Sequence, residues 1–256
     1  MEQKKKQVAI VRSQEKIAEG IFDMWIQTDL AKTAHAGQFI GVYPKDKSTL
    51  LPRPISICQV DEEGLRIVYR IAGKGTAEFS TYQKGDTITI LGVLGNGFPV
   101  EQGTGKKAVL LGGGIGIPPM LQLAKALGGQ ATVVAGYRNQ DLFLEKDLKE
   151  NSTLVIATED GSVGTKGNVL TAMKEQNIDA DVIFACGPMP MLKAIKTYAE
   201  EKNIPAYVSL EERMACGVGA CLGCVCKTKE VDHHSHVNNA RICTDGPVFL
   251  ASDLDL

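Results

Sequence analysis

The sequence contains no apolar run that approaches the roughly 20 residues a membrane-spanning helix needs. Its first residues, Met1 to Lys4, are polar and lack the apolar core of a secretion signal. The formal net charge is −2, so the basic excess typical of nucleic-acid-binding proteins is missing. We therefore expect a cytoplasmic protein that binds neither membranes nor nucleic acids.

The first hundred residues alternate between short apolar segments and turns. Candidate strands lie at 7–13, 20–28, 39–43, 55–60, 65–71 and 87–93, and a short helix fits 76–82. Strands at this spacing predict an antiparallel β-barrel over residues 1–100. The stretch 95–107, rich in glycine and polar residues, indicates a domain boundary.

Beyond this boundary, strands alternate with helices. We expect strands at 107–111, 131–135, 153–158, 181–185 and 206–209, and helices at 116–127, 168–176 and 188–202. This alternation predicts an α/β domain over residues 101–209, with a parallel sheet covered on both faces. Residues 210–256 have no such pattern. Because this segment can bury only a small hydrophobic core, we expect a small third module that needs a cross-link to hold it together.

The seven cysteines are unevenly distributed. Cys58 and Cys186 stand alone, whereas the other five lie in the third module, at Cys216, Cys221, Cys224, Cys226 and Cys243. An odd count without an export signal argues against a disulfide framework. The C-x4-C-x2-C spacing followed by a distant cysteine is that of plant-type ferredoxins, whose four cysteines hold a [2Fe–2S] cluster. The predicted ligands are Cys216, Cys221, Cys224 and Cys243.

Glycines between these cysteines suit a loop that wraps around a cluster. Gly217, Gly219 and Gly223 allow unusual dihedral angles and let backbone N–H groups approach sulfur. The alternative is a structural zinc site, whose ligand pairs are usually two to four residues apart, with a second pair further on. A tight triplet with one distant cysteine matches that pattern poorly.

Four further candidate ligands lie close to this motif. Cys226 follows Cys224 by two residues, and we interpret it as a spare. The imidazoles of His233, His234 and His236 lie in a polar stretch. We interpret this stretch as a solvated loop.

A glycine-rich turn lies between a buried strand and a helix at residues 109–120. Its glycines, Gly112, Gly113, Gly114 and Gly116, let the backbone approach a pyrophosphate at the helix N-terminus. Pro118 or Pro119 suits the first helical turn. The run is not G-x-G-x-x-G, so a tight turn without a ligand is the alternative.

Residues Cys186, Gly187 and Pro188 end another strand and begin another helix. Ligands of open α/β sheets bind outside the carboxyl ends of the strands, so both turns are expected at one sheet edge. The alternative is that Cys186 is simply a thiol packed in the hydrophobic core.

A second group of candidates lies in the predicted barrel. It comprises Arg53, Pro54, Ile55 and Ser56, then Val68, Tyr69 and Arg70, then Gly75 and Thr76. The two arginines and the turn that precedes the short helix suit phosphate, Ser56 offers a hydroxyl donor, and the Tyr69 ring is available for stacking. Each alone is a common surface feature; together they predict a cofactor site.

Taken in order, these motifs resemble the ferredoxin–NADP reductase superfamily. The tail, from Glu211 to Cys224 and from Arg241 to Phe249, is similar to the electron-transfer subunits of type B dihydroorotate dehydrogenase. The resemblance implies that the barrel candidates bind FAD and that the glycine turn and Cys186–Pro188 bind NAD. It also implies a catalytic partner carrying FMN, with two of each subunit, in pyrimidine biosynthesis.

The implied route takes electrons from the partner's FMN through the [2Fe–2S] cluster and FAD to NAD⁺, and needs no acid–base catalyst. NAD rests on the resemblance alone, because the sequence places no acidic residue securely at the adenosine ribose. Arg138, at the end of the second sheet strand, would suit the extra phosphate of NADP instead. One alternative is the flavin subunit of an NADH-dependent ferredoxin–NADP oxidoreductase or of a sulfhydrogenase. Another is a zinc-stabilised binding module without catalytic activity.

Overall fold

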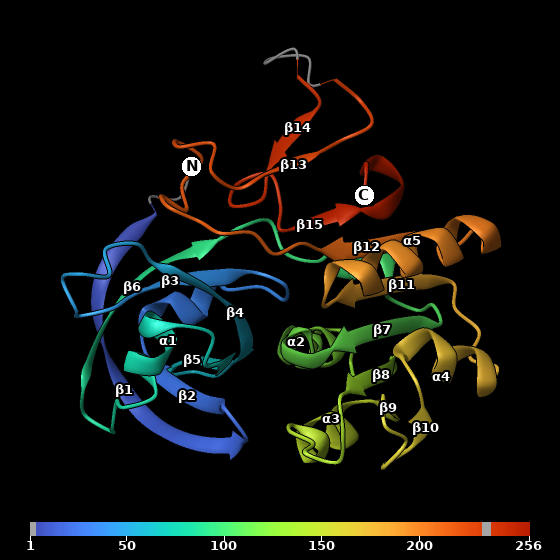
Figure 1. Cartoon of the computed structure of the whole chain (residues 1–256), viewed down its shortest axis with the longest axis horizontal. Helices are drawn as coiled ribbons and strands as arrows, with labels where there is room; N and C mark the ends of the chain where they lie inside the picture. Colours follow the sequence, from blue (N-terminus) through green and yellow to red (C-terminus); the bar gives the residue numbers. More distant parts are fainter. Residues whose placement is uncertain (1–3, 232–236) are drawn as a thin grey trace.

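The computed structural model describes residues 4–231 and 237–256. A β-barrel and a helix-covered sheet lie side by side, and the C-terminal tail runs across the top of both in Figure 1. The predicted architecture is confirmed. Within the described ranges no helix is both long and apolar enough to cross a membrane. The three histidines of the predicted loop, His233, His234 and His236, lie outside the described residues.

The barrel is closed and antiparallel, in the strand order β1-β2-β5-β4-β3-β6. Its strands are β1 (Lys5–Ala18), β2 (Ile21–Gln27), β3 (Phe39–Tyr43), β4 (Arg53–Val60), β5 (Gly64–Arg70) and β6 (Thr87–Leu94). Alternate side chains point inward, among them the buried Met24, Ile40 and Ile67. Helix α1 (Lys74–Phe79) adds the buried ring of Phe79 to this core.

The second sheet has seven strands, in the order β10-β9-β8-β7-β11-β12-β15. They are β7 (Ala108–Gly113), β8 (Thr132–Tyr137), β9 (Thr153–Thr158), β10 (Thr165–Lys166), β11 (Val182–Cys186), β12 (Ala206–Ser209) and β15 (Val248–Leu250). All pairings are parallel except that of β12 with β15. Helices α2 (Pro118–Ala126) and α3 (Glu145–Asn151) cover the face toward the barrel, and α4 (Val169–Glu175) and α5 (Met189–Lys202) cover the other.

Strand β15 comes from the tail, for which no regular structure was expected. The tail also forms a two-stranded sheet from β13 (Val225–Lys227) and β14 (Asn239–Arg241). Such short strands give no readable hydrophobic period, and tertiary pairing alone defines them. We propose that residues 1–100, 101–209 and 210–256 act as three units, with β15 fastening the third to the second.

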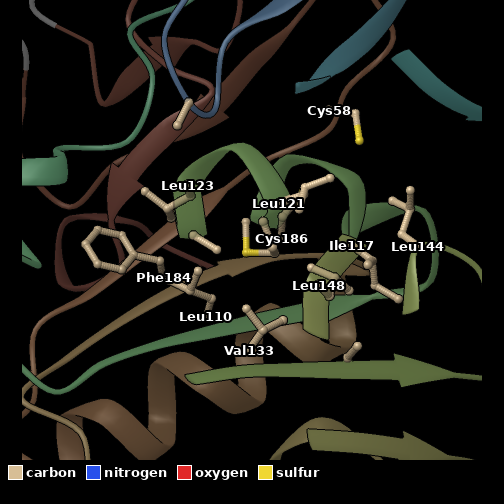
Figure 2. Close-up of a cluster of buried hydrophobic side chains, with 14 of the residues drawn as sticks. Cys58, Leu110, Ile117, Leu121, Leu123, Val133, Leu144, Leu148, Phe184 and Cys186 are labelled. Atoms are coloured by element: carbon tan, nitrogen blue, oxygen red, sulfur yellow. The ribbon is translucent and has the colours of Figure 1, made fainter. Parts of the chain in front are cut away.

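Helix α2 packs between the sheet and barrel strand β4. Figure 2 shows Leu121 and Leu123 of α2 in one buried cluster with Phe184 of the sheet, and Cys58 on the barrel side. The side chain of Gln122 accepts a hydrogen bond of 3.0 Å from the backbone N–H of Val60. The barrel and the α/β part of the chain therefore share a continuous hydrophobic core.

A buried ion-pair network crosses the same junction. The guanidinium of Arg66 on β5 donates to Asp23 on β2 at 2.7 Å and to Asp147 on α3 at 3.0 Å. It also donates to the Gln59 side chain at 3.1 Å. Although burial opposes the charged form, the two carboxylates hold the pKa of Arg66 above its ordinary value. Arg66 thus connects the barrel to the α/β unit.

We expect Arg66→Ala to lower the free energy of unfolding by about 3–5 kcal/mol, because it leaves the buried Asp23 carboxylate without its cation. Urea titration followed by circular dichroism measures this loss. The matched control is Arg12→Ala, which removes a more exposed cation beside Asp61 and Trp25 and should cost no more than about 1.5 kcal/mol. Equal losses in the two variants would contradict the importance of the network.

Candidate cofactor pocket and cysteine cluster

A pocket of about 610 Å³ opens at the end of the barrel that faces the sheet and the tail. This volume lies within the range of about 300–1,000 Å³ that is usual for small-molecule and cofactor sites. From the barrel its lining includes the predicted residues Arg53, Pro54, Ile55, Ser56, Val68, Tyr69, Arg70 and Thr76. One cavity therefore gathers candidates from three separate segments.

Arg53 lies against the first turn of α1. A Cβ atom added to Gly75 would stand 2.7 Å from the Arg53 Nε, so the guanidinium packs directly against this glycine. The Thr76 hydroxyl accepts from the backbone N–H groups of Ala72 at 2.8 Å and Gly73 at 3.2 Å. These contacts hold a cation and a tightened loop at one end of the pocket, an arrangement that suits a phosphate.

Tyr69 does not offer the stacking surface that the sequence suggested. Its ring is 1% exposed and stacks on Phe22, with centroids 5.9 Å apart, and its hydroxyl donates to Gln14 at 2.8 Å. Because side chains alternate along a strand, Tyr69 points into the barrel core while Val68 points outward. The expectation of stacking was wrong, and Tyr69 borders the pocket without presenting a ring face to it.

The tail supplies a wall of the pocket that sequence reasoning missed. Next to Ser209 at the end of β12, the lining includes the tail residues Leu210, Glu211, Glu212, Arg213, Met214 and Pro247. Desolvation at the pocket wall raises the pKa of the Glu211 carboxyl, although the residue is exposed overall, and the nearby Arg70 cation only partly offsets this. Acidic and basic groups of two different units thus face one cavity.

The glycine turn and the Cys186–Pro188 turn pack directly on each other. Cys186 at the end of β11 lies beside Gly112 of β7 in the sheet register. A Cβ on Gly116 would collide with the Cys186 carbonyl, and one on Gly113 would stand 2.6 Å from the Met191 sulfur. Close packing therefore accounts for these two glycines without any ligand.

Gly114 differs from its neighbours in the turn. Its φ is +54°, and a Cβ there would meet no atom within 4 Å, so it faces open space at the carboxyl edge of the sheet. The next residue, Ile115, lines the barrel pocket. The open edge of the predicted nucleotide turn therefore adjoins the predicted flavin pocket.

Cys186 is buried at this edge, with 1% of its surface exposed. Burial raises the pKa of its thiol to about 12, and only the contact with Ser209 acts in the other direction. The thiol therefore stays protonated in neutral solution. Cys186 combines a core position with a location beside the nucleotide turn.

The four predicted cluster ligands lie close together as two neighbouring pairs of thiols. Cys216 lies next to Cys221, and Cys224 lies next to Cys243. A cluster of two irons and four cysteines requires two thiolates at each iron, which this pairing matches. Within the described ranges no three cysteine, histidine or carboxylate side chains surround a single metal-ion position.

Backbone N–H groups point at these sulfurs. Cys216 accepts from Val218 at 3.4 Å and from the N–H groups of Cys221 and Ala220. Burial opposes ionisation, but these donors outweigh it and lower the pKa of Cys216 to about 6. A thiolate cage lined with N–H donors fits an iron–sulfur cluster, whose negative charge such donors stabilise.

Cys226 lies on β13, opposite Ala240 of β14. It is half-buried among apolar side chains, and burial raises the pKa of its thiol. Packing thus explains this residue, in keeping with its interpretation as a spare.

Both ends of the cluster-binding segment reach the barrel pocket. Met214, two residues before Cys216, and Pro247, four residues after Cys243, belong to the pocket wall. Gly217 lies close to the barrel, since a Cβ there would be 3.3 Å from Leu94 of β6. The cysteine cluster and the pocket are therefore adjacent parts of one site.

Comparisons with known proteins agree with this arrangement. Residues 211–255 match the iron–sulfur cluster binding domain of dihydroorotate dehydrogenase B. The electron transfer subunit of dihydroorotate dehydrogenase B (NAD(+)) from Streptococcus mutans is 43% identical over 253 residues, which cover 96% of each chain. Its counterpart from Geobacillus is 41% identical over 262 residues, covering 99% of each.

Solved structures extend the similarity to the fold. A chain of an NADH-dependent reduced ferredoxin–NADP oxidoreductase is 31% identical, with a TM-score of 0.86 over 97% of this chain and 90% of that one. A ferredoxin–NADP⁺ reductase from Neisseria gonorrhoeae, solved with bound FAD and NADP, has a TM-score of 0.66. It is 18% identical and covers 82% of this chain and 94% of that one, which supports the fold.

Two alanine substitutions separate packing from ligand binding in the glycine turn. Gly116→Ala should destabilise the protein by about 1–3 kcal/mol, because its methyl group collides with the Cys186 backbone. Gly114→Ala should cost only the left-handed backbone strain of about 1–2 kcal/mol. However, it should raise the KM for NADH about tenfold, equivalent to about 1.4 kcal/mol. Thermal melts and steady-state kinetics measure both effects, and an unchanged KM in Gly114→Ala would count against nucleotide binding at this turn.

Proposed function

The chain belongs to the family of electron transfer subunits of NAD(+)-linked dihydroorotate dehydrogenase B, and we propose that it connects a catalytic partner to NAD⁺ through its own FAD and [2Fe–2S] cluster. It is thus a subunit of an oxidoreductase. The observation that carries this proposal is that the cysteine-rich tail forms part of the wall of the pocket. The pocket predicted for FAD is bounded by Met214 and Pro247, which flank the predicted cluster ligands in sequence.

The residues around the pocket suit a flavin dinucleotide. Arg53, beside the first turn of α1, is the residue proposed to hold the pyrophosphate. Ser56 and the β5 residues Val68–Arg70 border the remaining cavity, with Ile55, Gly75 and Thr76 completing the proposed FAD set. Met214 and Pro247 close the side toward the cysteines and exclude water there.

The bound groups together supply the conversion between hydride exchange, which nicotinamide needs, and single-electron exchange, which an iron–sulfur cluster needs. The chain's own residues bind and orient them. Cys216, Cys221, Cys224 and Cys243 are the proposed cluster ligands, and the N–H groups of their loop stabilise its charge. No side chain is required as an acid or base.

For the nicotinamide nucleotide we propose the carboxyl edge of β7 and β11. Gly114 is the open position there, and Gly112, Gly113, Gly116, Cys186, Gly187 and Pro188 shape the turn beneath it. NAD is supported by the names of the relatives. Arg138, exposed after β8, is the cation through which a phosphorylated ribose would be recognised.

The partner is proposed to be an FMN-containing catalytic subunit, assembled as two of each chain. Support comes from the rim of the cysteine loop, where Cys221 is exposed. The apolar side chains of Val218 and Leu222 are 41% and 63% exposed beside it. Exposed apolar residues next to a cluster suit a surface that a second protein covers.

A second candidate function is that of the flavin subunit in an NADH-dependent ferredoxin–NADP oxidoreductase. It is favoured by the TM-score of 0.86 to a chain of such an enzyme. Copurification separates the two proposals. An FMN-containing barrel protein as partner supports the first, and a larger flavin and iron–sulfur subunit supports the second.

The direct test is a visible spectrum of the purified complex before and after adding NADH or dihydroorotate. We expect flavin and iron–sulfur absorbance that is bleached by NADH and, when the partner is present, also by dihydroorotate. A colourless preparation, or one that dihydroorotate leaves unchanged in the presence of its partner, would refute the proposed function.

Cysteine substitutions test the ligand assignment. Cys221→Ser should remove most of the iron and sulfide, since a ligand thiolate is lost, whereas Cys226→Ser should retain both. Iron and acid-labile sulfide assays on the purified variants measure this. If Cys226→Ser loses the cluster and Cys221→Ser keeps it, the proposed set of ligands is wrong.

A further inference from the structure

Asn96 extends from the barrel to the tail with all its side-chain hydrogen-bonding atoms engaged. It follows β6, on the barrel side of the pocket. Its side-chain Nδ2 donates to the carbonyls of Asp245 at 3.0 Å and Val248 at 2.9 Å. Its Oδ1 accepts from the Val248 N–H at 3.2 Å, and its backbone N–H donates to the Gly246 carbonyl at 2.7 Å.

The segment that Asn96 holds carries part of both proposed cofactor sites. It begins two residues after the predicted ligand Cys243 and includes Pro247, which lines the pocket. The neighbouring Gly95 packs directly on Pro247, because a Cβ there would collide with the proline ring. The barrel backbone and the tail therefore touch at the place where Asn96 binds.

The same segment also orders the opposite wall of the pocket. The Pro247 carbonyl accepts a hydrogen bond of 2.9 Å from the N–H of Leu210, and Val248 pairs with Ser209 across β15 and β12. On the cluster side, Asp245 accepts from the N–H of Arg241 at 2.8 Å and closes the turn that contains Cys243. The backbone of residues 245–248, which the Asn96 side chain holds, is therefore bonded to both the pocket wall and the turn that contains Cys243.

We propose that Asn96 is a positioning residue that sets the placement of the cluster's fourth ligand relative to the flavin pocket. This inference rests on the proposed function and assigns to Asn96 the geometry of electron exchange between the two sites. Asn96 touches no reacting atom, and it acts through the backbone of residues 245–248. Because Asn96 is exposed, replacing its side chain removes the tail contacts without opening a cavity in a core.

The test follows two steps separately in the purified protein with its bound cofactors. Stopped-flow absorbance measures flavin reduction by NADH, and rapid-freeze electron paramagnetic resonance measures reduction of the cluster. In Asn96→Ala we expect flavin reduction at the wild-type rate and cluster reduction slowed about tenfold. This is the low end of the effect of losing a direct partner of a metal ligand, because Asn96 reaches the fourth ligand only through the backbone of residues 245–248. Flavin, iron and sulfide contents are measured alongside and should match wild type.

Two further variants sharpen the comparison. Asn96→Asp keeps the size and the acceptor of Asn96 but places a carboxylate against two carbonyl oxygens, so it should slow the same step. The matched control is Asn151→Ala, which removes a hydrogen bond of 2.8 Å to the Asp147 carbonyl at the end of α3 and should change neither step.

Several outcomes would overturn the role of Asn96. Cluster reduction at the wild-type rate in Asn96→Ala is one, and equal slowing of the flavin and cluster steps is another. Loss of iron from both Asn96 variants would also overturn it, since Asn96 would then retain the cluster rather than position it. Wild-type protein that lacks flavin or iron would instead refute the proposed function itself.

Discussion

The fit of the tail against the end of the barrel is the constraint on which the rest of the structure depends. The barrel alone presents only an open end with Arg53 and Ser56 at its rim. The segment 209–214 and Pro247 turn that end into a cavity of about 610 Å³. Because the same stretch of chain carries the cysteine loop, forming the pocket and placing the cluster are one structural event. The short sequence separation of Met214 from Cys216 keeps the two sites adjacent.

The α/β unit meets this site through backbone packing. The glycine turn and the Cys186–Pro188 turn pack directly against each other, and Ile115 of the glycine turn forms part of the pocket wall. The angle at which this unit approaches is fixed by α2 against β4 and by the ion pairs of Arg66. A buried charge network is costly to form, but its directional contacts favour one relative placement of the two units.

Patterns within the chain predicted what depends on local regularity. The apolar runs of β3 and β11 matched the expected strands almost to the residue, because each is a short continuous apolar segment bounded by polar residues, glycine or proline. Cysteine spacing located the four clustered thiols, since ligand geometry imposes that spacing. The orientation of Tyr69 could not be predicted in this way. A strand buried on both faces gives no sign of which side chains point toward the barrel core and which point out of it.

The strands of the tail could not be predicted from the sequence for a related physical reason. Its strands are three residues long, and its buried side chains, such as Leu210, Ile242 and Val248, are too few and too scattered to form a period. A segment with so little core gains order from outside itself, through β15 on β12, the hydrogen bonds of Asn96 and the cluster that its thiols are proposed to hold. Metal binding to such a segment is linked to its folding, because the ligands converge only in the folded form. Since the same segment forms a wall of the pocket proposed for FAD, this linkage would make cluster binding and pocket closure reinforce each other.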